Sequence, residues 1–301
     1  MPALRVATRG SALARWQAER IVELLGVDAE YVIVSTKGDE RRDVPIHAMG
    51  GTGVFVKDVE QAVLDGAADV AVHSAKDLPS GDTPGLVLAA LPERGDPRDA
   101  LVGRALNDIP TGGCVGTGSV RRRAQLAALR PDLGFGELRG NIPTRLEKAA
   151  RFDAVVLAAA ALDRLELADQ IAERADPAVL LPQVAQGALA VQCRTGDDET
   201  QELLAAVDHA GVRAAVTAER AYLAELGGGC NLPCGALAET DDDGTVRLEA
   251  LLASLDGRIA LRVRVDGRDP VAVGSEAARR LVDDEGGRLV LDDDLVGDAP
   301  R

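Results

Sequence analysis

An internal repeat constrains the fold of this 301-residue chain more than any other feature. Residues 4–25 read "LRVATRGSALARWQAERIVELL" and residues 113–130 read "GCVGTGSVRRRAQLAALR". Each segment starts with a short β-prone run, passes through Thr, Gly and Ser, and continues as a helix with one apolar side. Ser11 and Ser119 stand where helix N-caps are expected. The duplication predicts two domains of similar build.

The likeness between the halves continues downstream. A strand and turn at 31–39 precede a helix and an apolar strand at 54–78, and residues 134–141 and 142–165 repeat this order. Strands that are apolar on both faces and alternate with helices are typical of mainly parallel sheets covered on both sides. We therefore expect two α/β domains.

The last third of the chain has a different pattern. A helix is expected at 212–226, followed by strand-like runs joined by Asp-Gly turns, which are hairpin signals, and by a helix at about 275–283. These elements predict a small α+β domain with an antiparallel sheet. The acidic tail beyond 292 is expected to be solvated.

Charge and composition exclude several classes. The chain has 34 basic and 49 acidic residues, a net charge of −15, which argues against nucleic-acid binding. Only four of the basic residues are lysines, a composition that suggests a high-salt source. No apolar run is long enough to span a membrane, and the first residues lack the features of a signal peptide. We expect a cytoplasmic protein without a disulfide framework.

Polar and basic residues gather where the expected strands end. In open α/β sheets, ligands bind beyond the carboxyl ends of the strands. The residues at these positions are Thr8, Arg9, Ser11, His73, Ser74, Lys76, Asp77, Thr117, Ser119, Arg121, Arg122, Arg139, Asn141 and Arg164, and Arg145 adds a further guanidinium group. Two helix N-termini and several guanidinium groups favour a small ligand with several acid groups. The alternative is that these arginines pair with the protein's own acids.

Asp77 in "HSAKDLP" has two interpretations. Its carboxylate could accept an N–H, stabilise a developing cation or move a proton, or it could be a turn residue before Pro79. His73 is interpreted as a hydrogen-bonded structural residue. The three histidines are scattered, so no metal site is expected. The glycine-rich segment 47–58 lacks the ending of a P-loop, and a mobile lid is an alternative.

Cys230 lies in "LGGGCNLPCG", where glycine leaves room for something to come close. It is either a thiol in a tight turn or a point of attachment. Cys230 and Cys234 have a spacing compatible with metal binding, but no second pair supports this. Cys114 and Cys193 lie in apolar stretches as core thiols.

Six motifs together resemble the porphobilinogen deaminase family, also called hydroxymethylbilane synthase. They are "ATRGSALARWQA" (7–18), "HSAKDLP" (73–79), "GTGSVRRRAQL" (116–126), "LRGNIPTRL" (138–146), "AQGALAVQCR" (185–194) and "GGGCNLP" (227–233). The resemblance implies a transferase of tetrapyrrole and heme biosynthesis. It would join four porphobilinogen molecules head to tail with loss of ammonia and release hydroxymethylbilane by hydrolysis.

The resemblance also implies site residues. Cys230 would carry a dipyrromethane cofactor as a thioether, and Asp77, with Lys76 and Arg9, would be catalytic. The residues implied for cofactor or substrate binding are Ser11, Gln17, Phe55, Lys57, Ser74, Thr117, Ser119, Arg121, Arg122, Arg139, Asn141, Arg145 and Arg164. The chain departs from the family at Thr52, where lysine is common, at Gly118, where serine is common, and at Cys234, which is expected to stay unmodified.

The family fold implies three domains. The first is discontinuous, 1–90 with 190–208, the second covers 95–184, and the third, with the cofactor cysteine, covers 210–301. The first two would be similar to periplasmic binding proteins and transferrin. A monomer is expected, with functional coupling to uroporphyrinogen-III synthase. The competing class is a binding protein, because a fold alone does not fix function.

Overall fold

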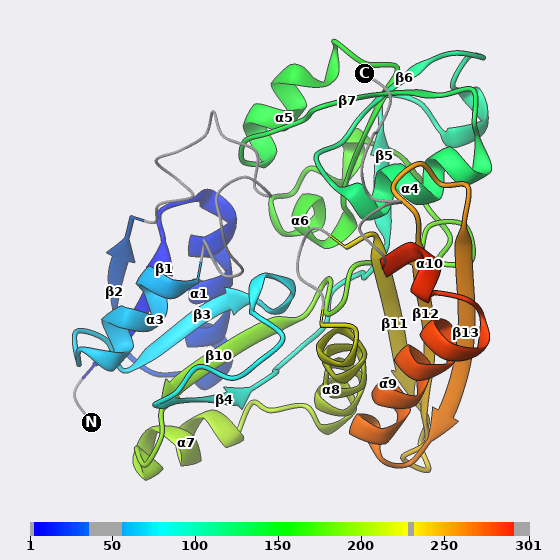
Figure 1. Cartoon of the computed structure of the whole chain (residues 1–301). Helices are drawn as coiled ribbons and strands as arrows, with labels where there is room; N and C mark the ends of the chain where they lie inside the picture. Colours follow the sequence, from blue (N-terminus) through cyan, green and yellow to red (C-terminus); the bar gives the residue numbers. More distant parts are fainter. Residues whose placement is uncertain (1–2, 36–55, 228–231, 292–301) are drawn as a thin grey trace. The chain divides into compact units, whose positions relative to one another are not determined.

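The structure is a computed structural model that describes residues 3–35, 56–227 and 232–291 (Figure 1). Contacts divide the chain into two units. Unit 1 is Met1–Gly95 with Gly187–Arg213, and unit 2 is Asp96–Gln186 with Ala214–Arg301. A discontinuous first unit was expected, although contacts group the C-terminal part with the middle of the chain. The finer division into three domains remains a prediction.

Unit 1 is built on a five-stranded sheet in the order β2-β1-β3-β10-β4. Strands β2, β1 and β3 are parallel, and β10 lies antiparallel between β3 and β4. The strands are β1 (Leu4–Arg9), β2 (Ala29–Val34), β3 (Val70–Ser74), β4 (Leu86–Ala90) and β10 (Leu189–Arg194). The helices are α1 (Ala12–Leu25), α3 (Lys57–Leu64) and α7 (Asp198–Ala205), with a short 3-10 helix η2 (Ala75–Asp77).

Both faces of this sheet are buried, because successive side chains of a strand point to opposite faces. Val6 of β1 packs in a cluster with Ile21 of α1, whereas its neighbour Ala7 packs in a second cluster with Val59 of α3. The helices therefore cover opposite faces, as the continuous apolar strands predict.

Unit 2 repeats this architecture in a sheet of order β7-β6-β8-β5-β9. Strands β7, β6 and β8 are parallel, and β5 lies antiparallel between β8 and β9. The strands are β5 (Asp99–Val102), β6 (Cys114–Gly116), β7 (Gly134–Gly136), β8 (Ala154–Ala158) and β9 (Ile171–Arg174). The helices are α4 (Val120–Leu129), α5 (Ile142–Ala149) and α6 (Ala159–Arg164), with 3-10 helices η3 (Leu106–Asp108) and η4 (Ala168–Gln170).

The two sheets correspond strand by strand, which confirms the duplication read from the sequence. The expectation of mainly parallel sheets is confirmed, because four of the five strands in each sheet run in the same direction and a single strand, β10 or β5, is antiparallel to its neighbours. The antiparallel strand of each, β10 or β5, follows the point where the chain passes from one unit to the other. These strands lie outside the repeated segment, so its pattern carries no information about their direction.

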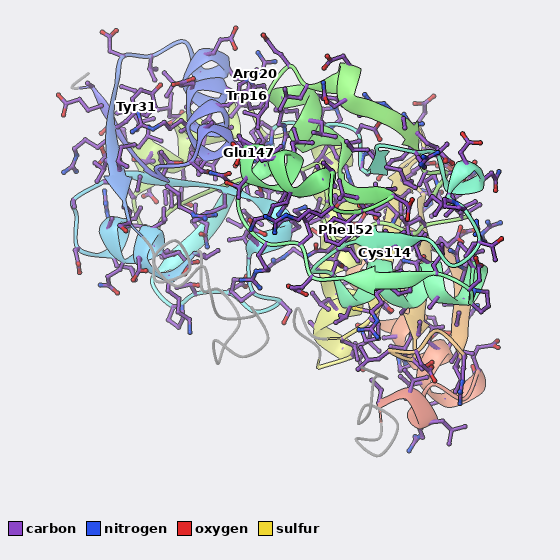
Figure 2. All side chains as sticks on the ribbon, turned by 90° about the horizontal axis from the view of Figure 1, so that it is seen from above. Trp16, Arg20, Tyr31, Cys114, Glu147 and Phe152 are labelled. Carbon is purple, nitrogen blue, oxygen red and sulfur yellow. The ribbon has the colours of Figure 1, made fainter. Side chains whose placement is uncertain are left out.

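One aromatic side chain fixes the spacing of β6 and β7. Phe152, labelled in Figure 2, occupies the space beside Gly116 and Gly136, where an added Cβ would lie 2.7 Å and 2.4 Å from its ring. Glycine at both positions therefore permits this close packing.

The C-terminal part of unit 2 is a three-stranded antiparallel sheet, as expected. It comprises β11 (Cys234–Thr240), β12 (Val246–Ala253) and β13 (Ala260–Gly267), and both hairpin turns contain a glycine with positive φ, Gly244 and Gly257. The remaining helices are α8 (Ala210–Glu225), α9 (Pro270–Arg279), the π-helical turn η5 (Arg280–Asp284) and α10 (Arg288–Leu291). Helix α9 begins earlier than expected because Asp269 caps it ahead of Pro270.

Candidate active site

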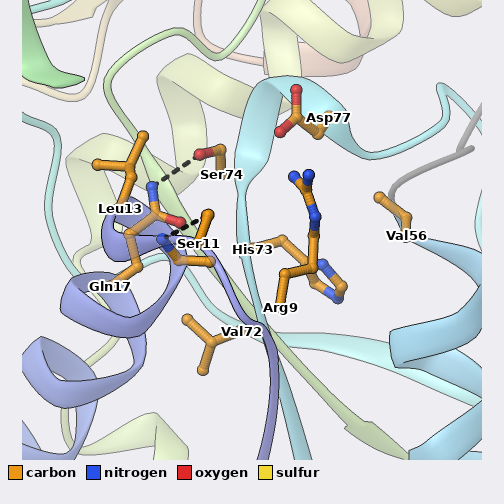
Figure 3. A pocket seen from close by; sticks show the side chains of 10 residues that line it. Arg9, Ser11, Leu13, Gln17, Val56, Val72, His73, Ser74 and Asp77 are labelled. Carbon is orange, nitrogen blue, oxygen red and sulfur yellow. Dashed lines mark hydrogen bonds between the residues drawn. The ribbon is translucent and has the colours of Figure 1, made fainter. Parts of the chain in front are cut away.

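A pocket in unit 1 lies at the carboxyl ends of β1 and β3, the edge at which a ligand was expected (Figure 3). The residues that line it are Arg9, Ser11, Leu13, Ala14, Gln17, Val56, Val72, His73, Ser74 and Asp77. Five of the sequence-predicted site residues therefore meet here: Arg9, Ser11, Gln17, Ser74 and Asp77.

Two side-chain hydrogen bonds stabilise the wall of the pocket that Ser11, Gln17 and Ser74 form. Ser11 caps α1 as expected, because its Oγ accepts the N–H of Ala14 at 3.2 Å. One turn further, Gln17 Nε2 donates to Ser74 Oγ at 2.7 Å and ties α1 to the end of β3. The Ser74 hydroxyl group is thus held in place by Gln17, which is almost fully buried.

Asp77 is placed by the 3-10 turn that follows β3. The turn is anchored where Ala75 N–H donates to Ala188 O at 3.0 Å. In Figure 3 the guanidinium group of Arg9 points towards the carboxylate of Asp77. A partly buried carboxylate beside a guanidinium group can accept an N–H of a ligand while the arginine faces an acid group.

His73 forms part of the pocket floor and is only 5% exposed. Burial, reinforced by the positive charge of Arg9, lowers the pKa of His73 from 6.5 to about 4, so the imidazole is neutral near pH 7. Its Nε2 has no hydrogen-bond partner among the described residues. The expectation of a hydrogen-bonded structural residue agrees with the burial of His73 and with its side-chain hydrogen bond to Gln192, which partly offsets the lowering of its pKa.

The remaining predicted residues of unit 1 lie elsewhere or are not described. Lys76 is part of η2 but does not line the pocket, and Lys57 is exposed at the start of α3. Phe55 and Thr52 lie outside the described residues, as does the expected lid apart from its last residues.

Unit 2 contains a buried cluster of two arginines and one carboxylate. Arg121 Nη1 lies 2.8 Å from Asp99 Oδ2, and Arg122 Nη2 lies 2.7 Å from Asp99 Oδ1. Burial alone would raise the pKa of Asp99, but the two guanidinium groups outweigh it and hold this pKa well below its ordinary value. Sequence reasoning missed Asp99, whose only signal is an acidic residue at the start of the apolar run "DALV".

Two nitrogen atoms of Arg121, Nε and Nη2, are buried and have no hydrogen-bond partner among the described residues. A buried guanidinium group in this state is suited to a carboxylate. Arg121 Cδ lies 3.2 Å from the point where a Cβ on Gly235 would stand. Arg121 therefore lies beside β11, the strand that follows the predicted attachment residue Cys230, which itself lies outside the described residues.

The other predicted residues of unit 2 serve the ends of α4 and α5. Ser119 caps α4 as expected, and Asn141 caps α5 by accepting the N–H of Thr144 at 3.0 Å. Thr117 Oγ1 accepts the N–H of Ser119 at 3.2 Å. The carbonyl oxygen of Arg139 accepts a hydrogen bond from Lys148 Nζ. Arg145 Nε donates to Gly140 O at 2.7 Å. Arg164 is 9% exposed.

Two departures from the family pattern have local explanations. A Cβ on Gly118 would lie 3.0 Å from both Glu137 Oε1 and Leu138 O, so glycine suits this turn. Cys234 is 6% exposed at the start of β11, and burial disfavours its modification. No group of histidine, cysteine and acidic residues in the described part of the chain could hold a metal ion, and none of its helices is long and apolar enough to cross a membrane.

Unit 1 presents a polar pocket with a carboxylate, and unit 2 presents a buried guanidinium edge that fits a carboxylated ligand. These features define the class of proteins that bind a small polyanionic ligand. The sequence matches "Porphobilinogen deaminase, dipyromethane cofactor binding domain" over residues 4–202 and "Porphobilinogen deaminase, C-terminal domain" over residues 213–283. The chain belongs to the porphobilinogen deaminase family, which polymerises porphobilinogen into hydroxymethylbilane in tetrapyrrole biosynthesis.

Curated relatives agree over nearly the whole chain. The porphobilinogen deaminase of Roseiflexus castenholzii is 46% identical over 299 residues, covering 96% of this chain and 98% of the relative. That of Moorella thermoacetica is 47% identical over 291 residues, covering 93% of each.

Solved structures that match include periplasmic binding proteins. One from Salmonella typhimurium has a TM-score of 0.37 at 13% identity and covers 69% of this chain and 92% of that chain. One from Brucella ovis has a TM-score of 0.37 at 14% identity and covers 67% of this chain and 65% of that chain. Likeness at this level carries no inference about function.

Proposed function

We propose that this chain carries out the reaction of its family with Asp77 as the central catalytic residue and Cys230 as the attachment point of the cofactor. The observation that supports it most is the pocket at the end of β3, where Arg9 points towards the Asp77 carboxylate above the neutral His73. The dipyrromethane group supplies a pyrrole chain end to which successive substrate units are joined.

The role of Asp77 follows from the movement of charge during ammonia loss. The C–N bond of the substrate's aminomethyl group breaks, the ammonium group leaves as ammonia, and the positive charge passes to the pyrrole ring. A carboxylate that accepts the ring N–H stabilises this cation. Joining the substrate carbon to the chain end would displace a ring proton, and Asp77 is the candidate base that would accept it.

We assign the arginines and the polar residues of the pocket wall to binding and orienting the carboxylate groups of the substrate and the cofactor. Each substrate carries an acetate and a propionate side chain, and guanidinium groups pair with carboxylates in two parallel hydrogen bonds. In unit 1 this role falls to Arg9, with Ser11, Gln17 and Ser74 forming the wall. The residues proposed for carboxylate or cofactor binding in unit 2 are Thr117, Ser119, Arg121, Arg122, Arg139, Asn141, Arg145 and Arg164, and Lys57, Lys76 and Phe55 complete the proposed set.

The experiment that tests attachment is the intact mass of the denatured protein beside the Cys230→Ala variant. We expect the wild-type chain to carry the extra mass of two linked pyrrole units and the variant to lack it. Extra mass on Cys234 in a mapped peptide would contradict the assignment of Cys230.

The experiment that tests catalysis is turnover of porphobilinogen by Asp77→Asn. Loss of the negative charge at the site of the developing cation should lower kcat by about 100-fold or more. Asp82→Asn, an exposed aspartate in the following loop, is the matched control and should keep wild-type turnover. Full activity of Asp77→Asn would remove Asp77 from the mechanism.

The expected setting of the enzyme is part of the same proposal. It comprises a cytoplasmic monomer, functional coupling to uroporphyrinogen-III synthase, and division into 1–90 with 190–208, 95–184 and 210–301. A solution mass near the chain mass of 31.3 kDa would support the monomer, and a mass twice as large would contradict it.

A further inference from the structure

Asp99 is a fully buried carboxylate at the start of β5, outside every motif that carries the family resemblance. Its two oxygen atoms accept hydrogen bonds from three side chains. Oδ2 accepts from Arg121 Nη1 at 2.8 Å, and Oδ1 accepts from Arg122 Nη2 at 2.7 Å and Nε at 3.0 Å. Oδ1 also accepts from Gln186 Nε2 at 2.8 Å. Asp99 thus joins α4 to the loop ahead of β10.

The two arginines use Asp99 differently. Arg122 donates Nε and Nη2 to Asp99 and Nη1 to Val156 O at 2.8 Å, so all three of its nitrogen atoms are engaged within the protein. Arg121 donates only Nη1, to Asp99 and to Leu181 O at 2.6 Å. Its Nε and Nη2 are buried without a partner among the described residues.

Nε and Nη2 form one side of the planar guanidinium group, and their two N–H bonds run parallel. This edge is the one that holds a carboxylate in a bidentate pair. The charges agree with this geometry, because among the described residues the two guanidinium groups share a single carboxylate, which leaves one of their positive charges without a paired carboxylate. A buried net charge needs a counter-ion, and the unpartnered Nε and Nη2 edge of Arg121 is where an anion would pair.

We propose that Asp99 is a positioning residue that fixes Arg121 through Nη1 and so presents the Nε and Nη2 edge to one carboxylate of the dipyrromethane cofactor. The proposal rests on the proposed function. Asp99 does not touch the cofactor, and it acts by setting the orientation and net charge of the group that does. Gln186 contributes by donating to Asp99 Oδ1, the same oxygen atom that accepts from Arg122 Nε.

The test compares Asp99→Asn with Asp96→Asn. Asp96 is the matched control because it also accepts from two arginines, Arg98 at 2.7 Å and Arg174 at 2.8 Å, but bonds neither Arg121 nor Arg122. Each variant is purified as folded protein, and two quantities are measured: the unfolding temperature, and the fraction of chains that carry the two-pyrrole mass before and during incubation with porphobilinogen.

We expect both variants to unfold at a lower temperature, since both lose a paired carboxylate. Only Asp99→Asn should load the cofactor about tenfold more slowly per folded molecule, the effect of losing a hydrogen bond to a charged group. Asp96→Asn should load within about twofold of the wild-type rate. Equal loading by Asp99→Asn and wild type would overturn the proposal, because a purely structural role changes stability and not loading.

A milder variant covers the case in which Asp99→Asn does not fold. Gln186→Met removes the hydrogen bond to Asp99 together with those to Pro97 O at 2.8 Å and Arg98 O at 3.3 Å but leaves both arginines paired, so it should slow loading by about threefold and also lower the unfolding temperature. Unchanged loading would again overturn the proposal. If wild-type protein itself never gains the two-pyrrole mass, the proposed function fails, an outcome separate from failure of the Asp99 role.

Discussion

His73 shows how one residue in the pocket ties stability to pH. Its folded-state pKa is about 4, against 6.5 for the unfolded chain. Between these values the unfolded state binds a proton that the folded state excludes, so His73 destabilises the fold as pH falls from about 6.5 towards 4. The loss approaches about 3 kcal/mol, since each unit of pKa difference is about 1.4 kcal/mol.

Denaturant titrations between pH 7.5 and 4.5 should therefore show a shallower loss of stability for His73→Gln than for the wild-type chain. His209→Gln, at an exposed histidine outside the pocket, is measured beside it as the comparison variant. If all three proteins share one slope, the protonation of His73 is not linked to unfolding. Asp99, whose pKa is depressed, adds a further loss only below about pH 3.8 and does not affect this window.

The structural roles of some residues can be predicted from the sequence, whereas those of others cannot. The caps Ser11 and Ser119 could be predicted because a cap is decided by the next three residues of the chain. Asp99 could not, because its partners Arg121 and Gln186 lie 22 and 87 positions away and only the folded sheet brings them together. The open guanidinium edge of Arg121 likewise depends on which of its nitrogen atoms the fold engages.

At the level of elements, helices and parallel strands follow from the repeat, whereas the antiparallel strands β5 and β10 do not. A strand's hydrophobic pattern is the same whichever way it runs, so its direction is set by the connection that precedes it. The position of the pocket was predictable because ligands bind beyond the carboxyl ends of strands, a property of the sheet as a whole. Its inner contacts, such as Gln17 with Ser74, were not.

At the contact between helices α8 and α9, helix propensity alone predicts the wrong sign for the effect of replacing a glycine by alanine. Replacing a helical glycine by alanine is normally stabilising by about 1 kcal/mol. At Gly274 of α9, however, an added Cβ would lie 2.2 Å from Ala218 O and 2.7 Å from Tyr222 N, both on the backbone of α8. Backbone cannot move aside as a flexible side chain does, so the methyl group must push the helices apart.

We therefore expect Gly274→Ala to destabilise the chain by about 1–3 kcal/mol in chemical denaturation. Val271→Ala on the same helix is the control, since Val271 is 54% exposed and its change should stay within about 0.5 kcal/mol. Folded Gly274→Ala protein should still carry the cofactor. A stabilised variant would mean that α8 and α9 lie further apart than described.

At the scale of the whole molecule, the return of the chain to unit 1 at Gly187 could not be read from periodicity. Periodicity identifies elements, but it does not say which sheet an element joins. The family resemblance suggested the return, and contacts within unit 1 agree, because Gly95 N–H donates to Gly187 O at 2.9 Å and Arg94 pairs with Ala188. Net charge, by contrast, is fixed by composition alone.

The net charge of −15 predicts opposite effects of salt on stability and on substrate binding. At about 0.01 M salt, repulsion between acidic residues extends roughly 30 Å, whereas near 1 M it is screened within about 3 Å. Raising NaCl should therefore raise the unfolding temperature by about 2 °C or more. The same screening weakens attraction between guanidinium groups and the carboxylates of porphobilinogen, so KM should rise.

Calorimetry and initial rates over the same NaCl series measure both effects, and choline chloride at equal ionic strength separates screening from specific ion binding. A falling unfolding temperature would mean that surface ion pairs, such as Arg5 with Asp69, contribute more than the net repulsion costs. In that case the acidic, lysine-poor composition would not be an adaptation to salt.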